Sequence, residues 1–182
     1  MPLPRDDFYT SEDYWNLPDD IRSDLIYGTL HIRKTPYRIH QQLLGAIYCI
    51  ISDYLKNFCP EYDLIMGPFG VNPDGDNQNW VEPDCSVVCA GDKLNDRCCI
   101  GAPDWIIEIV SFDTRKTDYI EKTYLYAQSG VREYWIIDPE KQQTTVYHFE
   151  KDYSPMFYPF DQSVSVGIFE ELNIVISDLL NK

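Results

Sequence analysis

The 182-residue sequence is poor in basic residues. Its 15 lysines and arginines stand against 30 aspartates and glutamates, which gives a formal net charge of -15 at pH 7. Because proteins contact nucleic-acid phosphates mainly through lysine and arginine, this balance excludes a broad basic surface for passive nucleic-acid binding. It leaves room for a local basic patch, or for a metal ion that offsets the negative charge within a site.

The sequence also lacks a hydrophobic run near the ~20 residues that cross a bilayer, and its acidic start, MPLPRDDFYTSEDYW, has no apolar segment typical of a signal peptide. We therefore expect a cytoplasmic protein with no membrane partner. No internal repeat, low-complexity tract or Gly/Ser linker divides the chain, which predicts one domain over residues 1–182. The hydrophobic content of 44% is typical of a globular chain with a core.

Disulfides and zinc sites are not expected either. The six cysteines contain no C-x-x-C pair, and the three histidines are not spaced to complete a zinc site with them. In the absence of a secretion signal, buried free thiols are the expectation. The cysteines are Cys49, Cys59, Cys85, Cys89, Cys98 and Cys99.

The apolar pattern predicts a chain of alternating helices and strands. The expected helices cover residues 10–17, 40–58 and 118–129, the last capped by Asp118 and closed by Gly130. The expected strands cover 23–34 as a hairpin, 62–71, 80–90, 104–111, 131–138 and 144–150, and residues 91–101 are expected to form a loop.

Residues 104–138 read as strand, helix, strand, which predicts a βαβ unit with parallel strands and a right-handed crossover. The apolar runs WIIEIV and YWII are typical of strands that are covered on both faces. The expected fold class is therefore α/β in the broad sense (α+β): a mixed sheet with helices packed on it.

Glu108 lies in the middle of WIIEIV, on the strand face that it shares with Ile106 and Val110. An unpaired ionised carboxylate on a covered strand costs several kcal/mol or binds a proton instead. A basic partner, a ring of hydrogen bonds or a divalent metal would compensate, and the residues alone do not decide between a metal site and a structural ion pair. The candidate partners in an ion pair are Arg115, Lys116 and Lys122.

Asp84, in the stretch VEPDCSVVC, is the second acidic residue in a strand-like run. Carboxylates on neighbouring strands that converge on one point repel each other, and a bound Mg²⁺ or Mn²⁺ would relieve the repulsion. Such a cation would organise a water nucleophile and stabilise charge on a phosphoryl oxygen. The alternative is that Asp84 caps a turn after Pro83.

Several stretches together resemble the Uma-type restriction endonuclease family of the PD-(D/E)XK nuclease superfamily. They are VEPDCSVVC, APDWIIEIVSFDTRKTDYIEKTYLYAQSGVREYWIIDPE and TTVYHF, with TSEDYWNLPDDIRSDLIYGTLHIRK and YRIHQQLLGAI before them. The resemblance covers nearly the whole chain. It implies a restriction-endonuclease-like mixed sheet flanked by helices, with an N-terminal hairpin and long helix, and a metal-dependent nuclease that hydrolyses phosphodiester bonds in DNA.

The family pattern, an Asp on one strand and E-x-K on the next, implies that Asp84 and Glu108 bind the metal, Mg²⁺ or Mn²⁺. Asp104 also fits the letters of the motif, but it stands four positions before Glu108, which is roughly 13 Å along one strand. Two carboxylates that far apart do not bind one ion, so Asp104 is expected to be a strand-start residue.

The sequence departs from the pattern at Val110, where E-x-K has a lysine. The resemblance suggests Lys122, on the following helix, as its replacement near Glu108. There it would polarise the attacking water or stabilise the pentacovalent phosphorane. The alternative is a solvated surface lysine paired with Glu121 or Asp118.

The N-terminal part of the resemblance adds Asp24 and His40 to the expected catalytic residues. Asp24 stands near a family glutamate, whereas Thr29 replaces a second acidic residue. His40 matches a family histidine and would orient a water or contact a phosphate; the alternative is a surface residue at a helix start. Arg115 and Lys116 are placed where a nucleic-acid backbone would be gripped.

Two other functions remain open at this stage: an inactive nuclease fold used for binding, and a hydrolase of a small phosphate ester. A homodimer is also possible, because aromatic residues near the C-terminus would form either an interface or part of the core. They are Tyr147, Phe149, Tyr153, Phe157, Tyr158 and Phe160.

Overall fold

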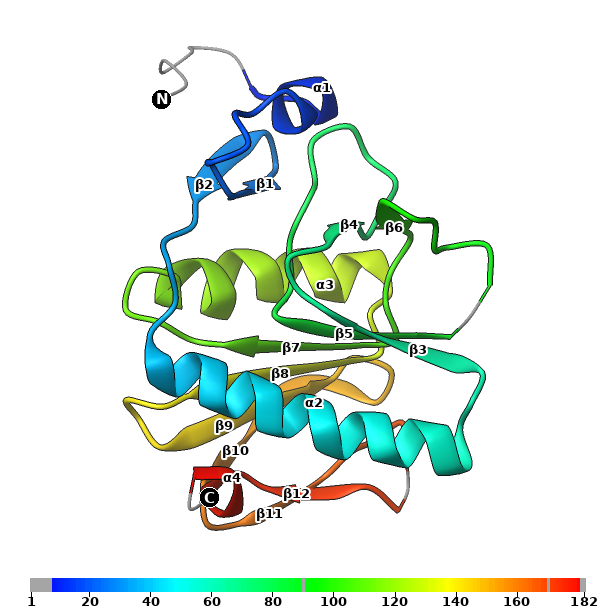
Figure 1. Ribbon diagram of the computed structural model, residues 1–182, viewed down its shortest axis with the longest axis vertical. Helices are drawn as coiled ribbons and strands as arrows, with labels where there is room; N and C mark the ends of the chain where they lie inside the picture. Colours follow the sequence, from blue (N-terminus) through cyan, green and yellow to red (C-terminus); the bar gives the residue numbers. More distant parts are fainter. Residues whose placement is uncertain (1–7, 90, 170, 181–182) are drawn as a thin grey trace.

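A six-stranded mixed sheet forms the centre of the computed structural model, which describes residues 8–89, 91–169 and 171–180 (Figure 1). The strand order is β10-β9-β8-β7-β5-β3, and β7 and β8 run parallel while the other neighbours are antiparallel. The expected mixed sheet and its parallel pair are therefore confirmed. The strands are β3 (Tyr62–Met66), β5 (Cys85–Cys89), β7 (Trp105–Ile109), β8 (Glu133–Asp138), β9 (Gln143–His148) and β10 (Asp152–Pro159).

Helices cover both faces of this sheet (Figure 1). The long helix α2 (Arg38–Phe58) packs on the face that carries Trp105, Ile107 and Ile109. A π-helical turn, η1 (Thr117–Lys122), continues into α3 (Thr123–Ser129) and packs on the opposite face, with Ile106. Because successive side chains of a strand point to opposite faces, Glu108 lies on the α3 side. No helix in the described ranges is long and apolar enough to span a membrane.

The N-terminal elements form a smaller layer above the α3 side of the sheet (Figure 1). Helix α1 (Ser11–Trp15) begins with a capping box in which Thr10 and Asp13 bond each other. The predicted hairpin is confirmed as β1 (Ser23–Ile26) and β2 (Thr29–Ile32).

The remaining elements are β4 (Gly70–Asn72), β6 (Cys98–Ile100), β11 (Ser163–Ser165), β12 (Asn173–Val175) and α4 (Ile176–Leu180).

Three predicted boundaries are wrong. The strand expected over 62–71 is two strands, β3 and β4, because Gly67 and Pro68 interrupt the strand. The strand expected over 80–90 begins only at Cys85, after Pro83, whose missing N–H cannot join a ladder. The loop expected over 91–101 contains β6, which pairs in parallel with β4 through partners far away in the sequence.

The helix expected over 118–129 also starts earlier than predicted. Residues 115 and 116 are already helical, so Asp118 is an interior residue and does not cap the helix. Its side chain is buried against Lys122. At the other end, Gly130 adopts a left-handed conformation with φ of 91°, which closes α3 as predicted.

The cysteine and aromatic predictions were met in part. All six cysteines are free, but only Cys85, Cys98 and Cys99 are buried. Of the six C-terminal aromatics, Phe149 and Phe160 belong to the buried core, whereas Tyr153 and Phe157 are more than half exposed. These residues therefore divide between core and surface.

Candidate active site

Asp84 and Glu108 lie on the same side of the sheet, at adjacent strands. Asp84 immediately precedes β5, Glu108 is in β7, and these strands pair through Cys85 and Ile107. The guanidinium of Arg33 touches both acids: its Nη2 is 3.2 Å from Asp84 Oδ1 and 3.9 Å from Glu108 Oε2. The two carboxylates thus flank a single cationic nitrogen.

Glu108 is 1% exposed and is paired with protein groups on its own face of the sheet. Its Oε1 lies 2.7 Å from Lys122 Nζ and accepts a hydrogen bond of 3.3 Å from the Tyr126 hydroxyl. The ion pair with Lys122, one of the alternatives raised by the sequence, is therefore present. Its other oxygen, Oε2, has the weaker contact with Arg33.

Lys122 is completely buried and contacts three carboxylates. Its Nζ lies 2.7 Å from Glu108, 3.0 Å from Asp24 and 3.2 Å from Asp118. The π-helical turn that ends at Lys122 places Asp118 and Lys122 together, both buried on the α3 side of the sheet. The alternative of a solvated surface lysine is excluded, although its expected pairing with Asp118 is observed.

Asp24 joins this cluster from the N-terminal hairpin. It is 2% exposed, its Oδ2 contacts Lys122, and its Oδ1 accepts a 2.8 Å hydrogen bond from the Glu82 amide. Its Oδ1 also lies 3.5 Å from Arg33 Nη1, which donates a hydrogen bond to the Glu82 carbonyl. The hairpin and the sheet are thus joined through buried charge.

His40 lies in the first turn of α2 and is buried, so its alternative as a surface residue is wrong. Its Nε2 is 3.0 Å from Asp84 Oδ2, which also accepts a 2.8 Å hydrogen bond from the Ile109 amide. Its Nδ1 is buried and has no hydrogen-bond partner among the described residues. His40 and Ile109 together fix the orientation of Asp84.

The cluster holds more negative than positive groups. Four buried carboxylates (Asp24, Asp84, Glu108 and Asp118) surround two cations, Arg33 and Lys122. Burial raises the pKa of Glu108 to about 8 against the pull of Lys122, and burial also raises the pKa of Asp118. For Asp84, burial is outweighed by the His40 hydrogen bond and Arg33, which lower its pKa to about 2. Glu108 and Asp118 therefore retain their protons more tightly than usual, because they are buried and lie near other carboxylates.

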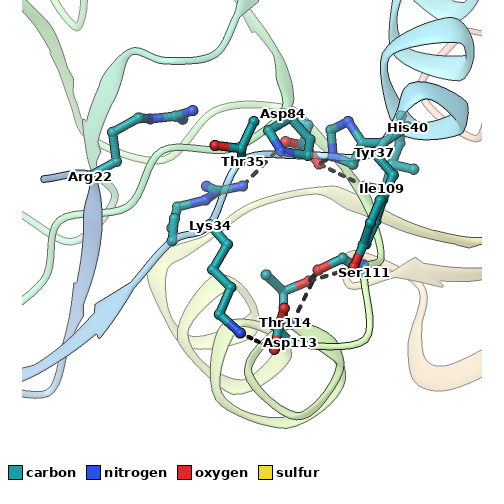
Figure 2. Close-up of a pocket in the computed structure, with 12 residues that line it drawn as sticks. Arg22, Lys34, Thr35, Tyr37, His40, Asp84, Ile109, Ser111, Asp113 and Thr114 are labelled. Atoms are coloured by element: carbon teal, nitrogen blue, oxygen red, sulfur yellow. Dashed lines mark hydrogen bonds and ion pairs between the residues drawn. The ribbon is translucent and has the colours of Figure 1, made fainter. Parts of the chain in front are cut away.

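A pocket of about 120 Å³ opens beside Asp84 (Figure 2). Figure 2 shows the ion pair between Lys34 and Asp113 on the far side of the pocket from Asp84 and His40. Three basic residues line the pocket, and each forms an ion pair: Arg22 with Glu82, Arg33 with Asp84 and Lys34 with Asp113. Its lining residues are Arg22, Arg33, Lys34, Thr35, Pro36, Tyr37, His40, Asp84, Ile109, Ser111, Asp113 and Thr114.

The negative charge of the cluster is suited to a divalent cation. Within the described residues, no three His, Cys, Asp or Glu side chains form a complete set of metal ligands. Mg²⁺, however, is commonly bound by one or two carboxylates, with waters and substrate phosphates as its other ligands. Asp84 and Glu108 would supply two carboxylates, and the surplus negative charge of the cluster would be offset.

The other sequence candidates lie outside this cluster. Asp104 directly precedes β7, where it accepts a 2.8 Å hydrogen bond from the Cys89 amide and contacts Arg132 at 3.3 Å. This is the strand-start role expected for it. Arg115 is paired with two acids (Asp138 and Glu140), and Lys116 is largely exposed.

The sequence gives no sign that Arg33 belongs to the cluster, and it indicates Asp118 only as a helix cap or as a partner of a surface Lys122. Arg33 follows the hairpin in an irregular segment, where no local pattern distinguishes a buried arginine from a surface one. Asp118 carried a detectable signal, since it stands four residues before Lys122 and such pairs share a helix face. A helix that begins at residue 118 makes Asp118 its cap, whereas the observed helix is already formed at residues 115 and 116.

The lowered pKa of Asp84 predicts a distinct acid dependence of stability in the metal-free protein. The folded pKa is about 2 and the unfolded value is 3.8, so the contribution of Asp84 is fully present above pH ~4 and disappears as the pH falls through 2. The free energy of unfolding of the wild type, relative to Asp84→Asn, should therefore increase by about 2 kcal/mol from pH 2 to 5. Urea denaturation across this range measures it, and a constant difference would contradict the ionic pairing of Asp84.

Comparison with known proteins matches the chain to one family and its fold to one solved structure. Residues 6–177 match the family described as "Uma2: Putative restriction endonuclease". A crystal structure described as a "putative nuclease belonging to DUF820", from Anabaena variabilis, superposes with a TM-score of 0.76. It is 23% identical, and the match covers 93% of this chain and 96% of that one, which shows a shared fold. Among curated proteins, none matches the chain significantly.

Proposed function

Because the chain belongs to the Uma2 family, described as "Putative restriction endonuclease", we propose that it is a metal-dependent nuclease that hydrolyses phosphodiester bonds in DNA. The site is the pair Asp84 and Glu108 with the basic pocket beside it. The cofactor is Mg²⁺ or Mn²⁺, bound by these two carboxylates. The proposal goes beyond the family assignment in naming the substrate, the metal and the residues.

One observation supports this proposal above the others: two buried carboxylates from adjacent strand segments, Asp84 and Glu108, contact the same guanidinium nitrogen of Arg33, next to a pocket lined by three basic residues. Arg22, Arg33 and Lys34 are concentrated there although acidic residues outnumber basic ones twofold in the chain. Carboxylates suit a hard divalent cation, and guanidinium and ammonium groups suit phosphate. A phosphodiester is the substrate class that needs both kinds of group together.

The residues of the site would divide the work of hydrolysis. The metal, when bound, would lower the pKa of a water molecule and stabilise charge on the phosphoryl oxygens. His40 and the Ile109 amide hold Asp84 toward the pocket. Lys122, fully buried at 2.7 Å from Glu108, is suited to holding that carboxylate in place, with Asp24 and Asp118 orienting the lysine.

A cleavage assay with matched variants tests the proposal. The purified protein is incubated with single- and double-stranded DNA, RNA and a small phosphodiester, with Mg²⁺, with Mn²⁺ and with EDTA. We expect cleavage of DNA that needs the metal, that is lost in Asp84→Asn and that persists in Asp104→Asn. Asp104 is the matched control, because it is also an aspartate beside the central sheet but pairs with Arg132.

The same assay separates the competing functions. Cleavage of the small phosphodiester alone would indicate a small-molecule hydrolase, for which the net charge of -15 is less of an obstacle. No cleavage of any substrate, with no effect of either metal on the melting temperature, would indicate an inactive nuclease fold. Cleavage that survives Asp84→Asn would remove the proposed site.

A further inference from the structure

Arg33 occupies the point at which the two metal-binding carboxylates of the proposed site converge. Its Nη2 lies between Asp84 Oδ1, at 3.2 Å, and Glu108 Oε2, at 3.9 Å, while its Nη1 faces Asp24 and the Glu82 carbonyl. The side chain is 10% exposed. A guanidinium in this place neutralises the same negative charge that a divalent cation would neutralise.

Glu108 does not itself reach the pocket. Arg33 and Asp84 both line the pocket, whereas Glu108, 1% exposed, does not. A cation that entered from the pocket would therefore reach Asp84 first and would meet Glu108 only where Arg33 Nη2 now stands. Two positive charges cannot share that point, because they would repel each other at a few ångströms in a buried environment.

The surroundings of Arg33 provide another place for its guanidinium. The residue lies at the start of the irregular segment 33–37 between β2 and α2, and the pocket cavity adjoins it. Arg22 and Lys34 line the same cavity, where they pair with Glu82 and Asp113, so a phosphate bound there would lie near two further cationic groups. Arginine binds phosphate oxygens with two parallel N–H groups, which makes the cavity a suitable second position for it.

We propose that Arg33 is a displaceable internal counter-cation: it holds the position between Asp84 and Glu108 in the metal-free protein, yields it to a divalent cation, and turns into the pocket to bind the substrate phosphate. This inference rests on the proposed function and adds to it that the Arg33 side chain has two positions, one between the acids and one in the pocket. The protein would thereby keep its buried acids neutralised before the metal arrives.

Direct binding measurements on Arg33→Gln test the exchange without relying on catalysis. Mn²⁺ affinity is measured by calorimetry on wild type and variant, and phosphate affinity by ³¹P NMR with Mg²⁺ present. Removal of Arg33 should tighten Mn²⁺ binding at least tenfold, because the competing charge is gone. It should weaken phosphate binding at least tenfold, because a ligand of the phosphate is gone. A purely structural role does not produce these opposite changes.

Arg132→Gln is the matched control, since Arg132 also bridges two acids, Asp104 and Glu150, and its loss changes the net charge equally. It should leave both affinities at the wild-type values. Mn²⁺ binding that is equal or weaker in Arg33→Gln would overturn the inference alone. Failure of Mn²⁺ to bind either protein would overturn it together with the proposed metal site, and unchanged phosphate affinity would overturn the move into the pocket.

A measurement on the unaltered protein does not depend on how the variant folds. In the metal-free state, the Nε–Hε NMR signal of Arg33 should exchange slowly with solvent, since the side chain is held by buried acids. Saturation with Mg²⁺ should shift this signal and accelerate its exchange. A signal that saturating Mg²⁺ leaves in place would overturn the proposal.

Discussion

Glu108→Gln is expected to lower the rate of phosphodiester cleavage roughly 10³-fold, since a metal-assisted step contributes several kcal/mol and each 1.36 kcal/mol is a factor of ten. The amide still offers an oxygen to Lys122 and Tyr126, which now bond the carboxylate. The folded structure should therefore persist while the negative charge proposed to bind the cation is lost. Initial cleavage rates at saturating Mg²⁺ measure the effect.

The same substitution should leave the metal-free protein at least as stable as the wild type at alkaline pH. The folded pKa of Glu108 is about 8 and its ordinary value is 4.5, so the wild type loses stability as the pH rises from about 4.5 through 8. Gln has no charge to bury, and the variant avoids that loss. Urea denaturation at pH 6 and pH 9 checks this sign, and a variant that is less stable at pH 9 would contradict it.

Glu133→Gln is a matched control for Glu108→Gln. Glu133 is also a fully buried glutamate, in the neighbouring strand β8, but it accepts hydrogen bonds from Trp135 and the Ile168 amide. Its replacement should reduce stability, because a charged acceptor of two hydrogen bonds is lost, and should leave the cleavage rate near the wild-type value. A large loss of rate in both variants would point to general disruption of the sheet.

Lys122→Met is expected to destabilise the protein by about 3–5 kcal/mol, as is usual when one partner of a buried ion pair is removed. Methionine fills a similar volume but leaves Asp24, Glu108 and Asp118 facing one another without their shared cation. At a few degrees of melting temperature per kcal/mol, thermal unfolding should show a fall of roughly 10 °C.

Lys116→Met, six residues earlier, serves as the comparison for Lys122→Met. The side chain of Lys116 is 79% exposed and lies 3.5 Å from Glu121. Exposed pairs of this kind contribute little, so its replacement should change the free energy of unfolding by less than about 0.5 kcal/mol. Equal losses in the two variants would contradict the view that the buried network, rather than helix charge in general, stabilises the protein.

The sequence by itself determined the architecture and the two central acids. The parallel pairing of β7 and β8 followed from the order strand, helix, strand and from apolar runs typical of covered strands. The helix over residues 40–58 followed from its apolar spacing. Glu108 stood out for the same reason: a carboxylate inside an apolar strand must have a partner wherever the strand is buried. These features depend on the local spacing of apolar residues, which can be recognised without knowledge of distant contacts.

Only the tertiary structure decided what compensates that charge. Arg33 reaches the site from the segment after the hairpin, Lys122 from a π-helical turn and Asp24 from β1, and no local pattern states that these segments meet. The strand break at Gly67 and the pairing of β4 with β6 were decided in the same way, by neighbours far along the chain. Sequence periodicity shows which side chains are buried, but the balance of charge in a buried cluster depends on which distant segments fold against one another.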